Sequence, residues 1–146
     1  MKKLALITVI FKNYTILDDY FASLSKQTDK DFHVYALDLT PEPQNYSYPP
    51  YVTYIHDRNG GYAYGINQGV KKALTDGYEM VAPMNCDVTV KETFVENIKK
   101  SITQNPSSIM GGKIVLPEAD ANITKCIKNF RLTPTDISDF WKIFQK

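Results

Sequence analysis

The residues best suited to chemistry in this chain are Asn85 and Asp87, which follow an apolar run at residues 78–84. In an extended chain alternate side chains lie on one face, so this spacing can direct two oxygen ligands at one point. Hard divalent cations such as magnesium bind oxygen ligands and keep waters and substrate phosphates in their remaining positions. The pair therefore predicts a site for a metal–diphosphate group. In the alternative interpretation, Asn85 forms a turn and Asp87 caps the helix that follows.

Strand and helix patterns alternate along the rest of the chain around this pair. Apolar runs typical of strands lie at residues 3–10, 32–37, 52–56, 78–84 and 108–116. Apolar residues at helical spacing predict helices at residues 17–27, from residue 62 to about residue 74, and at residues 94–102, the last opened by a capping box at residues 89–92. This alternation predicts an α/β fold with a mostly parallel sheet and right-handed crossovers.

Three polar clusters fall where predicted strands end, namely Asp38, residues 59–61 and residues 85–87. Open parallel sheets bind their ligands outside the carboxyl ends of the strands. The clusters therefore predict one site at one edge of the sheet. Taken singly, Asp38 could be an ordinary turn residue, and Gly60 and Gly61 a plain loop-to-helix turn. The glycine spacing does not match a dinucleotide-binding motif.

Composition limits the partners and the compartment. The formal net charge is +1, from 17 basic and 16 acidic residues, which gives no electrostatic footprint for nucleic acid. The apolar run after the first residues is short and predicts a buried strand, not a signal peptide, and no segment has the length to span a bilayer. Cys86 and Cys126 lack metal-ligand spacing and favour free thiols in a reducing compartment. We expect a cytoplasmic protein, with a peripheral position at the inner face of the membrane as the alternative.

Other candidate residues have simpler interpretations. Neither His33 nor His56 has a triad partner in the sequence, so packing or surface roles are expected. Cys86 should point away from its two neighbours and be buried. A tyrosine cluster near the proline-rich segment either packs on the surface or stacks on a sugar or base; it comprises Tyr46, Tyr48, Tyr51 and Tyr54.

Several motifs resemble, in the expected order, those of a family 2 glycosyltransferase of the GT-A fold, in its rhamnosyltransferase-like branch. Residues 6–13 resemble the opening strand and loop, residues 21–28 the SL…Q helix end, and residues 59–69 the NxGFAxxxNxG stretch, which is the most specific match. Asn85 and Asp87 stand where the metal-binding DxD motif belongs, and NxD is common in that branch. The chain departs from the family at Phe11 and Lys12, and its acidic pair after the second strand is reduced to Asp38.

The resemblance implies a Rossmann-like GT-A domain at residues 1–132 that transfers a sugar, from a nucleotide-diphosphate donor such as dTDP-rhamnose, to a cell-surface polysaccharide or glycan. It implies a divalent metal, Mg or Mn, held by Asp87 and Asn85. The implied donor-binding residues are Phe11, Asn13, Asp38, Asn59, Gly60, Gly61, Asn67 and Asn85. No catalytic residue is assigned, because the acceptor half with its general base is expected to be truncated, and the chain alone is expected to transfer sugar poorly. The alternative is a non-catalytic nucleotide-sugar-binding or interaction module.

Residues 133–146 predict an amphipathic helix, with a threonine cap and a proline at the first helical position. Its apolar stripe consists of Ile137, Phe140, Trp141 and Phe144. We expect this stripe to pack on the domain. The alternatives are docking on a membrane, on a second copy of the chain or on a partner chain.

Overall fold

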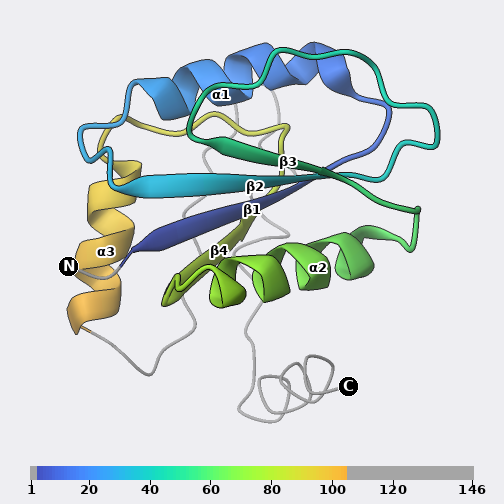
Figure 1. Ribbon diagram of the computed structural model, residues 1–146. Helices are drawn as coiled ribbons and strands as arrows, with labels where there is room; N and C mark the ends of the chain where they lie inside the picture. Colours follow the sequence, from blue (N-terminus) through green and yellow to red (C-terminus); the bar gives the residue numbers. More distant parts are fainter. Residues whose placement is uncertain (1–2, 105–146) are drawn as a thin grey trace, which may run out of the picture. The chain divides into compact units, whose positions relative to one another are not determined.

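The computed structural model describes residues 3–104 of the 146-residue chain. Within them, parallel strands form one sheet in the order β3-β2-β1-β4 (Figure 1). The strands are β1 (Leu4–Ile10), β2 (Phe32–Asp38), β3 (Val52–His56) and β4 (Met80–Met84). The predicted parallel α/β sheet is confirmed, although β4 begins two residues later than its apolar run suggested. The predicted strand at residues 108–116 and the predicted helix at residues 133–146 lie outside the described residues.

Helices cover both faces of this sheet. A short 3-10 turn, η1 (Tyr14–Ile16), leads into α1 (Leu17–Ser25), and α2 (Tyr62–Thr75) and α3 (Phe94–Gln104) follow. The side chains of α1 and α3 pack in the apolar cluster on one face of the sheet, whereas α2 packs on the other (Figure 1). No helix in the described part of the chain is both long and apolar enough to cross a bilayer.

The predicted capping box at residues 89–92 is wrong, because α3 begins only at Phe94. The backbone N–H of Phe94 instead donates to the Lys91 carbonyl in a tight turn, at 2.9 Å. The N–H of Val95 donates to Oε1 of Gln27, also at 2.9 Å. The cap of α3 therefore comes from a glutamine beyond the end of α1.

Two glycines let α2 approach the sheet closely. A Cβ atom at Gly65 would lie 2.8 Å from Cγ2 of Val9, and one at Gly69 would lie 2.7 Å from Cδ2 of Leu37. Separations this short are not tolerated between carbon atoms, so larger residues would push the helix away from the strands. The glycines thus hold the first half of α2 against the carboxyl-terminal halves of β1 and β2.

Candidate functional site

The three predicted polar clusters meet at the carboxyl edge of the sheet. Asp38 is the last residue of β2, in register with Ile10 on one side and His56 on the other. The Asp57 N–H donates to the Asp38 carbonyl at 3.0 Å, which connects β2 to the segment leading to residues 59–61. The Tyr62 hydroxyl at the start of α2 donates to Oδ1 of Asn85 at 2.9 Å, which connects that segment to the turn after β4.

The turn after β4 presents its polar side chains outward. Asn85 and Asp87 are exposed, whereas Cys86 between them is 4% exposed. The Cys86 thiol donates to the Val9 carbonyl and accepts from Nδ2 of Asn13, both at 3.5 Å. Burial raises the pKa of this thiol, so it stays protonated at neutral pH. The expected burial of Cys86 is confirmed, and the thiol joins the loops that follow β1 and β4.

The loop after β1, residues 11–13, adds an aromatic ring to the edge. Phe11 is 43% exposed, and its N–H donates to Oδ1 of Asn13 at 3.2 Å. Lys12 has a φ of 61°, a left-handed conformation that non-glycine residues adopt rarely. Its N–H is bound by Oγ1 of Thr40 at 2.9 Å, and its ammonium lies 5.3 Å from the centre of the Phe11 ring. A strained residue with a positive charge at this edge was not predicted from the sequence.

Asp38 lies behind this edge and is fully buried. Its Oδ2 accepts from the hydroxyls of Tyr14 at 2.6 Å and Tyr54 at 3.2 Å, and its Oδ1 accepts from the Thr40 N–H at 3.0 Å. Burial and the carboxylate raise the pKa of Tyr14, and they raise that of Tyr54 to about 12. A nucleoside contact by Asp38 remains a prediction, because its carboxylate faces these tyrosines and not the solvent.

Residues 59–61 form the entrance to α2. Oδ1 of Asn59 accepts the N–H of Gly61 at 3.0 Å, and Gly61 is the N-cap with a φ of 88°, which favours glycine. Gly60 lies between them, and its Cβ position is filled by the Tyr64 ring. Further along α2, Oδ1 of Asn67 is buried and accepts no hydrogen bond from the described residues.

Four side chains beside this entrance were given no role from the sequence; they belong to Asp57, Arg58, Tyr62 and Tyr64. Exposed Arg58 lies over the Tyr64 ring, with its guanidinium carbon 4.9 Å from the ring centre. The Tyr64 hydroxyl donates to Oδ2 of Asp57 at 2.8 Å. Tyr62 is 52% exposed and reaches Asn85. The position of Tyr62 directly after the two glycines was the signal available in the sequence. Its partner Asn85 is 23 residues away, so the contact between them could not be predicted.

The oxygen atoms available as metal ligands at this edge suit a hard divalent cation. Within residues 3–104 no group of three or more histidine, cysteine or acidic side chains could hold a metal ion. Asp87 and Asn85 offer a carboxylate and an amide, both exposed. Such a pair fits a hydrated magnesium or manganese ion that takes its other ligands from water and phosphate, and does not fit a closed structural zinc site.

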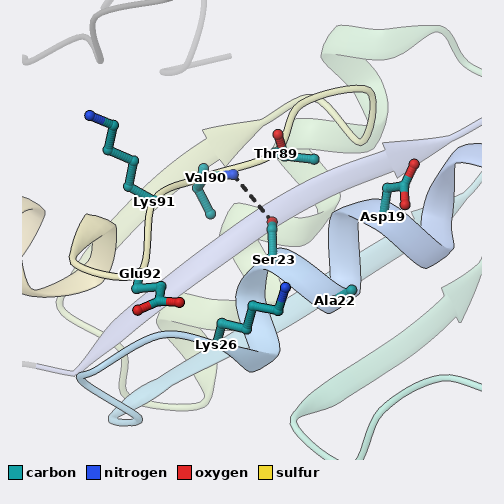
Figure 2. Close-up of a pocket in the computed structure, with 8 residues that line it drawn as sticks. All are labelled: Asp19, Ala22, Ser23, Lys26, Thr89, Val90, Lys91 and Glu92. Atoms are coloured by element: carbon teal, nitrogen blue, oxygen red, sulfur yellow. Dashed lines mark hydrogen bonds between the residues drawn. The ribbon is translucent and has the colours of Figure 1, made fainter.

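A separate open pocket of about 360 Å³ lies between α1 and the segment before α3 (Figure 2). Its floor includes the hydrogen bond from the Val90 N–H to Oγ of Ser23, at 3.2 Å. Its charged lining residues balance in sign; they are Asp19, Glu92, Lys26 and Lys91. None of the predicted site residues lines this pocket, so it is distinct from the sheet edge.

Comparisons with known proteins agree with the architecture. The family model described as glycosyl transferase family 2 matches residues 5–142. The crystal structure of S. aureus TarS has a similar fold, with a TM-score of 0.57 and 16% sequence identity. That similarity covers 80% of this chain but 23% of TarS, so the chain spans about a quarter of the length of TarS. A search of curated proteins gives no match.

Proposed function

Because the chain belongs to glycosyl transferase family 2, we propose that it binds a nucleotide-diphosphate sugar at the carboxyl edge of its sheet. We further propose that the sugar is transferred to a cell-surface polysaccharide or glycan. The observation that carries the proposal is the exposed Asn85 and Asp87 pair, which hydrogen bonds and packing join to the loop after β1 and to the start of α2. Parallel sheets bind ligands at this edge.

The residues of this edge divide between the two halves of the donor. Asp87 would hold a magnesium or manganese ion, which neutralises charge on a leaving diphosphate. Asn59, Gly60 and Gly61 leave the backbone open beside the first turn of α2, whose amides have no acceptor within the helix and favour an anion. The unpaired Oδ1 of Asn67 supports including this residue among the donor contacts.

The nucleoside half would lie against aromatic rings. Phe11 is exposed beside Asn13, and Tyr54 is 38% exposed with its ring stacked on Tyr48 at a centroid distance of 4.8 Å. Stacking of a base on such rings contributes about 1–3 kcal/mol. Asp38 would contribute through Tyr54, whose hydroxyl donates a hydrogen bond to it at 3.2 Å. Alternatively, a nucleoside hydroxyl would replace the Tyr54 hydroxyl as the donor to Asp38.

The test is calorimetric binding of UDP and dTDP with magnesium, with manganese and with a chelator. We expect binding that depends on the metal, and Asp87→Ala should abolish that dependence while leaving the melting temperature unchanged, since the side chain is exposed. Asp19→Ala, an exposed aspartate on α1, is the matched control and should bind as the parent does. Equal affinity with metal and with chelator would remove Asp87 as a ligand.

The same protein should then be assayed with a panel of nucleotide sugars, with and without manganese. Release of the nucleotide from one donor, dependent on Asp87, would identify that donor. Absence of nucleotide binding under every condition would contradict the proposed function.

A further inference from the structure

The contact between Tyr62 and Asn85 fixes the orientation of the Asn85 side-chain amide. The Tyr62 hydroxyl donates to Oδ1 of Asn85 at 2.9 Å. A hydroxyl that donates requires an acceptor opposite it, which is the amide oxygen and not the amide nitrogen.

This orientation leaves the amide nitrogen of Asn85 without an acceptor among the residues that the structure describes. The oxygen and nitrogen of an amide lie on opposite sides of one planar group, so fixing the oxygen toward Tyr62 turns the nitrogen away from it. Asn85 is exposed, and Nδ2 donates no hydrogen bond to any of residues 3–104. Two N–H donors beside the Asp87 carboxylate are suited to an anion's oxygen atoms, because a metal ion needs lone pairs that Nδ2 lacks.

We propose that Tyr62 is a positioning residue that holds Asn85 with its amide nitrogen toward the diphosphate of the donor. Asn85 then donates a hydrogen bond to a diphosphate oxygen, and Asp87 is the only one of the pair that contacts the metal. This inference rests on the proposed function, because it assigns roles within the same site.

The first experiment measures manganese alone, by the loss of its free electron paramagnetic resonance signal on titration with protein. Asn85→Ala should bind manganese within twofold of the parent, whereas Asp87→Ala should lose binding. Asn85→Asp should bind manganese more tightly, because it adds a second carboxylate. If Asn85→Ala weakens manganese binding as much as Asp87→Ala does, Asn85 is a metal ligand and the inference is overturned.

The second experiment measures UDP and dTDP affinity in a double-mutant cycle. Loss of one hydrogen bond lowers affinity about threefold to tenfold, so Tyr62→Phe and Asn85→Ala should each weaken binding by about that factor. The double variant should bind no more weakly than Asn85→Ala, since residues that act through one another are not additive. Full additivity would show that Tyr62 does not act through Asn85.

Tyr35→Phe is the matched control for the loss of a tyrosine hydroxyl. The Tyr35 hydroxyl donates to Oδ2 of Asp76 at 2.7 Å, away from the donor site, so this variant should retain the parent's nucleotide affinity. A parent protein that binds neither nucleotide would overturn the proposed function and this inference together. If the parent binds a nucleotide but the effects of Tyr62→Phe and Asn85→Ala on its affinity are additive, the inference alone fails.

Discussion

At the scale of single residues, the Asp38 carboxylate joins three segments around the site. It accepts hydrogen bonds from Tyr14 in η1, from Tyr54 in β3 and from the backbone of Thr40. Asp38→Ala would remove the short hydrogen bond from the buried Tyr14 hydroxyl, and a hydrogen bond to a charged group contributes about 1.5–3 kcal/mol. We therefore expect this variant to lower the free energy of unfolding by at least that amount, measured by denaturant titration.

Tyr54→Phe is the companion variant. Its bond to Asp38 is longer, at 3.2 Å, and its ring is 38% exposed, so it should lose less stability than Asp38→Ala. An Asp38→Ala protein as stable as the parent, but weaker in nucleotide binding, would assign the carboxylate to the nucleoside and not to the framework.

The strand pattern in the sequence predicted the position of Asp38 at the end of β2. Its two tyrosine partners, 24 and 16 residues away, depend on the packing of the folded sheet and loops and could not be predicted.

At the scale of elements, Gln27 connects α1 to α3. Its side chain is 1% exposed; Nε2 donates to the carbonyls of Ser23 at 3.1 Å and Lys91 at 2.9 Å, and Oε1 accepts from Val95. Gln27→Ala removes all three bonds and leaves the first turn of α3 uncapped. We expect the free energy of unfolding to fall by about 1–3 kcal/mol. Relative to the parent, hydrogen exchange should accelerate more at the start of α3 than in the other elements.

The control for this variant is Gln104→Ala, an exposed glutamine at the end of α3, which should change neither quantity. Unchanged exchange at Val95 in Gln27→Ala would show that the glutamine does not cap the helix.

The hydrogen bond between Gln27 and Val95 explains why the capping-box prediction failed. Sequence spacing finds caps within a few residues, whereas this cap comes from 68 residues away.

At the scale of the whole molecule, the fold was predictable because strand and helix patterns alternate with little ambiguity. The apolar runs located β1 to β4 within two residues, and parallel order follows from that alternation. The family assignment from residues 59–69 and the NxD pair is likewise confirmed. Contacts between distant segments, such as that of Tyr62 at the start of α2 with Asn85 after β4, were not predictable, because they require two elements to be placed side by side first.

The stability of the described domain should fall as the pH drops below neutrality because of His33. This partly buried histidine of β2 is hydrogen-bonded to Oγ1 of Thr53 at 2.8 Å, and its ring contacts the rings of Tyr35 and Tyr78, at centroid distances of 5.2 and 6.0 Å. Burial lowers the pKa of His33, although the Asp76 carboxylate opposes this. The unfolded chain, with a histidine pKa of about 6.5, therefore binds a proton before the folded chain does.

Well above about pH 6.5, His33 is neutral in both the folded and the unfolded chain, so it does not change the free energy of unfolding. As the pH falls through about 6.5 toward its lowered folded value, protonation favours the unfolded state and the free energy of unfolding decreases. The aspartates with lowered pKa values contribute below this window, because their effect on stability develops only as the pH falls below about 5; they are Asp29, bonded by the Asp31 N–H and Lys99, Asp57, bonded by Tyr64, and Asp76, bonded by Lys72. Denaturant titrations between about pH 7 and 5 should show the decrease in the parent and a flatter profile in His33→Gln. An equal decrease in both proteins would place the titrating group elsewhere in the chain.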